Sequence, residues 1–246
     1  MPGPRRLRGG VLRPQGRPEL THFAETSMKA LPVPPGRWKR NALVLALVIA
    51  AVVGGAAARA PILRFLGAVL VVEDPLSPAE VIVIAIDGGA AGVLEAADLV
   101  HAGVSERVAL FAEGPDAVDA EFIRRGFHVE DKAAKWRRML GVLGVTNVEE
   151  IPVPVNGTEA EAVFLPRWCD DHHLQSIVVV TTPDHSRRVK RVIRRAMGDR
   201  PTRVSVRPAR VSSFDSKSWW RTRGGTRTGI VELEKLLLDV VRHPFS

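Results

Sequence analysis

Residues 177–188 read IVVVTTPDHSRR, and this stretch is the best guide to the fold. Four apolar β-branched residues are followed by a Thr-Thr-Pro break, and a helical spacing of apolar residues begins at Val189. The pattern predicts a buried strand, a sharp turn and an amphipathic helix with His185 at its start. Ligands of open α/β sheets bind at the loops after the carboxyl ends of the strands, so His185 is a candidate for chemistry. The alternative is that Asp184 only caps the helix and His185 is a surface residue.

Strands and helices alternate through the rest of the domain. Strands are predicted at residues 81–86, 108–112, 148–153 and 203–206 in addition to 177–180. The first is a continuous apolar run, the third is broken by Pro152, and the last is short. Helical patterns fit residues 94–100, 116–126 and 131–143, a segment opened by Asn156, Gly157 and Thr158, and the segment after His185. This alternation predicts an α/β fold with a Rossmann-like, mostly parallel sheet of about five strands, right-handed crossovers and flanking helices. In a doubly wound sheet the first and fourth strands are neighbours where the strand order reverses.

The carboxyl-terminal segment predicts one more amphipathic helix. Its apolar side is formed by Ile230, Leu233, Leu237 and Val240, and its polar side by Glu232, Lys235 and Asp239. We expect the apolar side to dock on the sheet. The preceding pair, Trp219 and Trp220, is expected to belong to the core or to anchor this helix, in preference to forming a ligand platform.

A long apolar segment precedes the domain. Residues 41–58 carry no charge, and residues 37–40 read RWKR, which together predict a membrane-spanning helix over 37–59. The positive-inside rule puts residues 1–36, a Pro-, Gly- and Arg-rich tail that we expect to be disordered, in the cytoplasm. Residues 60–246 then form an extracytoplasmic domain on a single-pass plasma-membrane anchor. A cleaved signal ending at 56–60 is the alternative, which the length of the apolar run disfavours.

The formal net charge of +8 is concentrated in two segments. Residues 1–40 contribute +7, and residues 187–227 hold fourteen basic and two acidic side chains. The overall basicity is therefore a property of the tail, and we expect no nucleic-acid partner. The second segment predicts a cationic face for an anionic ligand or for acidic headgroups, against the alternative of a solvated helix face.

Polar residues and glycines gather where the predicted strands end. The loop after the first strand would face the loop after the fourth, and both precede helix amino termini that aim partial positive charge at a ligand. The catalytic candidates are His185, Asp87 and Glu161, and the ligand-binding candidates are Gly88, Gly89, Glu113, Thr158, Thr182, Asp184, Arg187 and Arg188. A histidine beside carboxylates can act as general acid or base, Asp87 or Glu161 would orient it or a bound metal, and the two arginines would contact phosphate.

Several common motifs are absent from the sequence. The glycines form no full dinucleotide fingerprint, and neither a Walker loop nor a nucleophile elbow is present. Cys169 is the single cysteine, which excludes an intrachain disulfide. We also predict no metal site at residues 170–173, which read DDHH, because adjacent side chains at a helix end diverge. No cofactor is indicated.

Short motifs in a fixed order give the domain a resemblance to a known family. They lie at residues 73–76, 79–83, 88–89, 94–97, 157–162, 182–188 and 219–221, with Glu232 and Lys235. Residues 70–240 thereby resemble the YdcF-like family, the SanA/ElyC group. The resemblance implies a Rossmann-like fold, often behind one membrane helix, and a link to peptidoglycan or lipid-carrier handling in the bacterial envelope. One member is described as binding S-adenosylmethionine.

Three positions depart from the family pattern. Asp87 stands where a further glycine is commoner, residues 113–115 read EGP in place of a glycine pair, and Ala160 stands where many members have an acid. A carboxylate role in that helix would then fall to Glu159 or Glu161.

Three functions follow as hypotheses, and whether the protein is an enzyme is left open. The first is an envelope protein that binds or processes a phosphorylated glycan or polyprenyl-linked precursor. The second is a nucleotide or S-adenosylmethionine binder, and the third is a non-catalytic scaffold for envelope protein partners. An open polar pocket between the Gly88 and His185 loops would favour a ligand, and a filled space would favour the scaffold.

Overall fold

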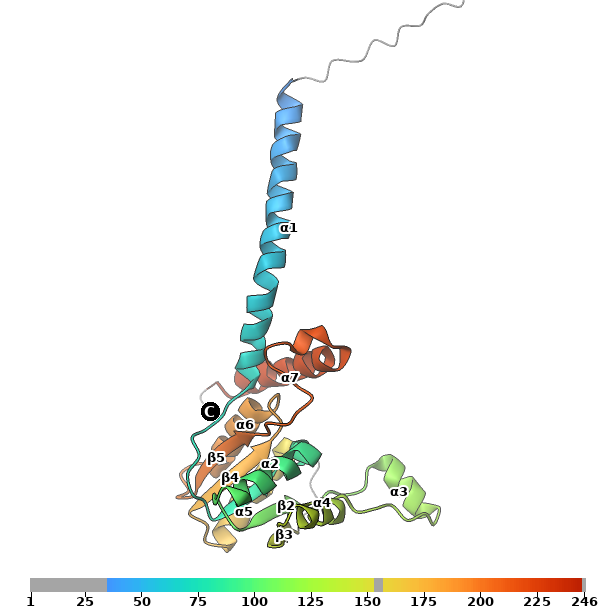
Figure 1. The fold of residues 1–246 in the computed structure, drawn as a ribbon, viewed down its shortest axis with the longest axis vertical. Helices are drawn as coiled ribbons and strands as arrows, with labels where there is room; N and C mark the ends of the chain where they lie inside the picture. The colour runs from blue at the N-terminus through green and yellow to red at the C-terminus, as the bar shows by residue number, and fades with distance from the viewer. Residues whose placement is uncertain (1–34, 153–156, 245–246) are drawn as a thin grey trace, which may run out of the picture. The chain divides into compact units, whose positions relative to one another are not determined.

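The computed structural model describes residues 35–152 and 157–244, and the chain divides after Val52 into two units. A parallel five-stranded sheet forms the centre of the second unit (Figure 1). Its strands are β1 (Val81–Ile84), β2 (Val108–Phe111), β3 (Val148–Ile151), β4 (Ser176–Thr181) and β5 (Arg203–Pro208). The order β3-β2-β1-β4-β5, with every neighbouring pair parallel, confirms the predicted Rossmann-like fold.

Helices cover both faces of this sheet. Successive strand residues point to opposite faces, so Ile82 packs with α2 (Gly89–His101) and α4 (Lys132–Val142), while Val83 packs with α5 (Thr158–Asp171) and α6 (Ser186–Met197). The strands β1, β2 and β4 are buried along almost their whole length, which explains their uninterrupted apolar runs. By contrast, α3 (Ala117–Arg124) buries none of its residues.

Three predicted strands extend beyond the observed ones, and the smallest difference is one residue, at the end of β2. β1 stops at Ile84, and residues that were expected to extend it form the short helix η1 (Ile86–Gly88), which the Gly88 N–H closes by donating to the Ala85 carbonyl. β3 stops at Ile151, and the predicted end of that strand at residue 153, with Asn156, lies outside the described residues.

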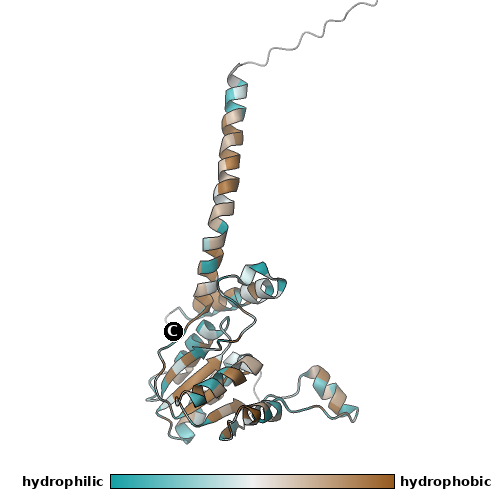
Figure 2. Cartoon of the chain, in the orientation of Figure 1, coloured by the Kyte–Doolittle hydropathy of each residue, from teal (hydrophilic) through white to brown (hydrophobic). Residues whose placement is uncertain are grey.

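The apolar segment forms α1 (Pro35–Leu70), which is longer than the predicted 37–59. Among the described residues, one helix is long and apolar enough to cross a membrane, and it is α1 (Figure 2). Pro61 lies inside it without ending it. The helix continues because Leu63, Leu66 and Leu70 pack in a small core with residues from the carboxyl-terminal part of the chain.

Trp219 lies at the centre of that small core. It belongs to η2 (Trp219–Arg221), and its indole N–H donates to the Leu63 carbonyl at 2.8 Å. A Cβ on Gly67 would lie 2.7 Å from the Trp219 ring, and one on Gly229 would lie 2.5 Å from it. Glycines therefore let α1 and the last helix approach the indole closely, and Trp219 has the anchoring role that was predicted.

The last helix, α7 (Arg223–Arg242), does not dock as predicted. Ile230, Leu237 and Val240 are 55%, 63% and 39% exposed, whereas Glu232 and Asp239 are buried. The prediction of an apolar face docked on the sheet is wrong because α7 packs on α6 and η2, and α6 presents arginines to it. Buried carboxylates of α7 pair with those arginines, and of the four predicted apolar residues Leu233 alone packs against the small core around Trp219.

The basic segment 187–227 is neutralised in large part by such pairs. Arg191 and Arg195 both contact Asp239, at 2.6 and 2.9 Å, and Lys190 bonds to Asp74. In contrast, Arg223 and Arg227 are exposed and have no ion-pair partner within 35–152 and 157–244. The predicted cationic face is therefore much smaller than the charge count suggests.

Candidate functional site

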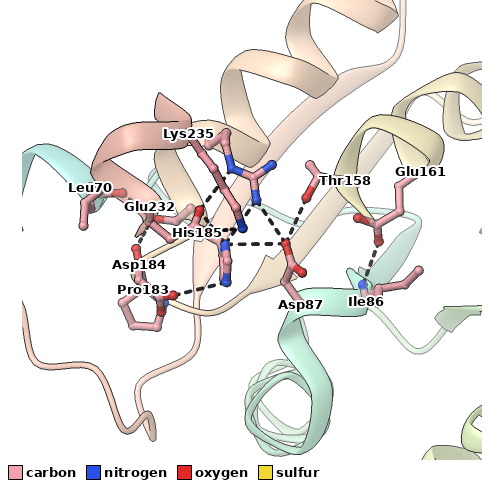
Figure 3. Close-up of polar contacts among 12 residues, drawn as sticks. Leu70, Ile86, Asp87, Thr158, Glu161, Pro183, Asp184, His185, Glu232 and Lys235 are labelled. Atoms are coloured by element: carbon pink, nitrogen blue, oxygen red, sulfur yellow. Dashed lines mark hydrogen bonds and ion pairs between the residues drawn. The ribbon is translucent and has the colours of Figure 1, made fainter. Parts of the chain in front are cut away.

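The two predicted loops meet because β1 and β4 are neighbours in the sheet. Ile84 pairs with Val180 at the carboxyl ends of the strands, and the Ala85 N–H donates to the Val180 carbonyl at 2.9 Å. β1 leads into η1 and α2, and β4 leads into α6. Asp87 and His185 consequently face each other across the point where the strand order reverses (Figure 3).

Glu232 of α7 is the closest partner of His185. His185 Nδ1 lies 2.8 Å from Glu232 Oε2, and the Glu232 side chain is only 2% exposed. Arg188 Nε donates to the same oxygen at 3.1 Å, and Lys235 Nζ donates to Oε1 at 2.6 Å. A buried carboxylate thus joins one histidine to two cations from α6 and α7.

Two more carboxylates complete this His185 cluster. Asp184 Oδ2 lies 3.2 Å from His185 Nε2, so each ring nitrogen faces a carboxylate. Asp87 Oδ2 lies 3.6 Å from both His185 Nδ1 and Arg188 Nη2, and it accepts a hydrogen bond from Thr158 at 2.9 Å. Asp184 therefore contacts the histidine instead of capping α6, whose first residues receive no side-chain cap.

These neighbours set the pKa values of the pair. Burial alone would lower the pKa of His185, but the hydrogen bond to Glu232 and the charges of Asp87 and Asp184 outweigh it and raise that pKa. Burial would raise the pKa of Glu232, but hydrogen bonds from His185 and Lys235 lower it to about 2. The contact between the two side chains therefore favours the protonated form of His185 and the ionised form of Glu232.

Glu161 lies on the other side of Asp87, on the first turns of α5. Its Oε1 accepts the Ile86 N–H at 2.6 Å, which ties α5 to η1. Burial raises the pKa of Glu161 to about 7, because the Ile86 hydrogen bond only partly offsets the loss of water. Glu161 would therefore change charge near neutral pH. It contacts the loop after β1, through the Ile86 N–H.

Several other residues predicted to bind a ligand lie outside the His185 cluster. Arg187 donates to the Val69 and Val71 carbonyls at the end of α1, and Glu113 pairs with Lys132 at 2.9 Å beside α4. Gly88 is buried under the Val180 carbonyl, and Gly89 has a φ of +47° at the start of α2. The Thr182 hydroxyl is buried without a hydrogen-bond partner in the described part of the chain.

A pocket of about 470 Å³ opens beside the cluster, between α5, α6 and α7. Its lining consists of Glu159, Arg188, Lys235, Leu238, Asp239, Arg242 and His243. Three cations and two carboxylates line the pocket, so the lining is cationic by one charge. Asp239 is matched by Arg191 and Arg195, whereas Arg188 and Lys235 share the buried Glu232. Since Arg188 Nη2 is 3.2 Å from His185 Nδ1, the pocket and the histidine share one side chain.

The site offers little to a metal ion. Within 35–152 and 157–244, no group of three or more His, Cys, Asp or Glu side chains could hold one. Near the carboxyl end of α5, Asp170 pairs with Arg200 at 2.9 Å, and His172 Nδ1 lies 2.8 Å from the Trp168 carbonyl.

The sequence candidates included Asp87, Thr158 and His185 but omitted Glu232 and Lys235 as site residues. The sequence analysis placed both residues on the polar side of the last helix, which was expected to face solvent. They were missed because the orientation of that helix was predicted wrongly. One signal in the sequence could have identified them as site residues, because both are among the positions that carry the family resemblance.

Comparison of the chain with protein-family models, with curated proteins and with solved structures finds no match. The resemblance to the YdcF-like family therefore stays a prediction from the motifs.

Proposed function

We propose that this protein is a membrane-anchored cell-envelope protein whose α/β domain binds an anionic precursor outside the cytoplasm. The precursor would be a phosphorylated glycan or a polyprenyl-linked compound. The observation that carries the proposal is the cationic pocket lined by Arg188, Lys235 and Arg242 beside His185. Arginine and lysine side chains are well suited to bind phosphate oxygens.

The geometry of His185 supports binding more directly than proton transfer. Both ring nitrogens face carboxylates, at 2.8 and 3.2 Å, so the ring is held in place and neither nitrogen is free for a substrate. Processing of the precursor would require the weaker contact with Asp184 to open, after which Nε2 could donate its proton to a leaving oxygen. Glu232 would keep the ring oriented during that step.

A direct test uses the full chain in lipid nanodiscs and compares a polyprenyl phosphate with the matching polyprenol. We expect measurable binding of the phosphate and at least about tenfold weaker binding of the alcohol, because charge-assisted hydrogen bonds are lost. Lys235→Gln and Arg242→Gln should each weaken phosphate binding about tenfold. Arg125→Gln, which removes an exposed cation directly after α3 that does not line the pocket, is the matched control and should bind normally. Equal binding of phosphate and alcohol would refute the proposal.

A nucleotide or S-adenosylmethionine binder is the second candidate. It is favoured by the glycine pair at the start of α2, where the strand order reverses. Titration of the same nanodisc preparation with S-adenosylmethionine and with a nucleotide-sugar distinguishes it from the first.

The scaffold hypothesis also has an observation in its favour. Side chains of Asp87, His185 and Arg188 bridge the space between the two loops. It predicts that His185→Ala leaves envelope growth unchanged in cells, whereas a ligand-binding role predicts a defect.

A further inference from the structure

The outward face of α7 is apolar where a soluble domain would be polar. At 3.6 residues per turn, one side of the helix collects residues that are all exposed. They are Arg223, Arg227, Ile230, Glu234, Leu237, Leu238 and Val241. Leu237 and Val241 are 63% and 70% exposed, and such contiguous apolar surface on a helix marks a binding surface.

This face is fixed close to the point where α1 would leave a membrane. Trp219 bonds to Leu63 and contacts Gly67 of α1 on one side and Gly229 of α7 on the other. Leu63 is four residues beyond Arg59, the first charge after the uncharged run, which is roughly 6 Å along a helix. α7 crosses the carboxyl end of α1 and does not run along it (Figure 1).

α1 itself stays apolar and exposed at this level. Ile62 and Phe65 are 56% and 68% exposed, on the same turns that hold Trp219. Both helices therefore present large apolar side chains to the outside within a few turns of the predicted membrane exit. An interfacial lipid layer, which is several ångströms deep, would cover both.

Two of the three charged side chains on the outward face, Arg223 and Arg227, fit an anionic partner, and Glu234 is the third. Arg223 and Arg227 lie in the first turns of α7, where the helix dipole disfavours cations. Neither has an ion-pair partner in the part of the chain that the structure describes. Acidic lipid headgroups would both pair with these arginines and offset the dipole.

We propose that α7 is an interfacial helix whose outward face, from Arg223 to Val241, lies in the headgroup layer of an anionic leaflet. The inference rests on α1 crossing the membrane and holds whether or not the pocket binds a phosphate. Lys235, Leu238 and Arg242 line that pocket at the edge of the same face. A lipid-linked phosphate would reach the pocket without leaving the membrane surface.

The test places a fluorescent probe on full-length protein in nanodiscs of phosphatidylcholine and phosphatidylglycerol. Leu237→Cys and, in a second preparation, Val241→Cys are labelled with an environment-sensitive dye, since the native Cys169 is buried. Val142→Cys on α4, also a strongly exposed apolar position, is the matched control. We expect spin-labelled phospholipid to quench the two α7 probes at least about threefold more than the control.

A second arm tests the role of charge. Arg223→Gln combined with Arg227→Gln should abolish the difference in quenching between nanodiscs with and without phosphatidylglycerol. Equal quenching of the α7 probes and the control would overturn the proposal. A blue-shifted α7 probe that lipid quenchers do not reach would overturn it too, because a second copy or another protein would then cover the face.

Discussion

Glu161 is a buried carboxyl whose ionisation opposes folding. Its pKa is raised to about 7 from 4.5, so between those values the folded chain holds a proton that the unfolded chain has lost. Stability from this group is present below pH 4.5 and falls as the pH rises through 7, by roughly 3 kcal/mol in total.

Glu161→Gln should remove this pH dependence, because the amide oxygen still accepts the Ile86 N–H but cannot ionise. From pH 5 to pH 8, the thermal unfolding midpoint of the wild-type chain should fall roughly 5–10 °C further than that of the variant. Glu106→Gln, at an exposed position, should follow the wild type. Parallel curves for Glu161→Gln and wild type would show that this carboxyl does not ionise with a raised pKa.

At the residue scale, site residues that directly follow a strand were predictable from the sequence. Site residues on the distant carboxyl-terminal helix were not. Asp87 and His185 directly follow the first and fourth strands, and adjacent parallel strands bring them together. Glu232 comes from α7, and its position depends on how that helix is rotated. No local pattern determines that rotation, because it results from pairing with arginines of α6.

At the element scale, the contact of α7 with Trp219 depends on a glycine. Gly229→Ala puts a Cβ about 2.5 Å from the indole and should destabilise the chain by roughly 1–3 kcal/mol. Gly224→Ala, on the same helix, has nothing within 4 Å of the new Cβ and should be neutral or stabilising by up to about 1 kcal/mol. Thermal unfolding of both variants measures the difference, and equal midpoints would mean that Trp219 does not hold α7 in place.

The orientation of α7 also explains why its apolar pattern gave a wrong prediction of the face that docks on the domain. An amphipathic helix is expected to bury its apolar side because water is assumed to surround the protein. Here the buried side contains Glu232 and Asp239, whose partners are arginines, together with Leu236. Three of the four residues of the predicted apolar side are exposed, and Leu233 packs against the small core. The strands were predictable because burial on both faces leaves one simple signature, a continuous apolar run.

At the scale of the whole molecule, alternation of strands and helices was sufficient for the fold, since a parallel sheet with this spacing has few arrangements. The pocket was not predictable, because its lining comes from α5, α6 and α7, which meet only in the folded chain. The proposed side of the membrane for the domain depends on the charges that flank the uncharged run 41–58, which lie outside the sheet.

That orientation is the premise of the proposed function and can be tested in a bacterium. Residues 1–40 carry nine basic and two acidic side chains, so this segment should stay in the cytoplasm. Alkaline phosphatase fused after residue 246 should be active, and a fluorescent protein fused there should be dark. Replacing Arg37, Lys39 and Arg40 by Gln should lower phosphatase activity, whereas the same change at Arg124, Arg125 and Arg138 should not. A bright fluorescent fusion would place the pocket in the cytoplasm, where nucleotides and S-adenosylmethionine are made, and would favour the second candidate function over the first.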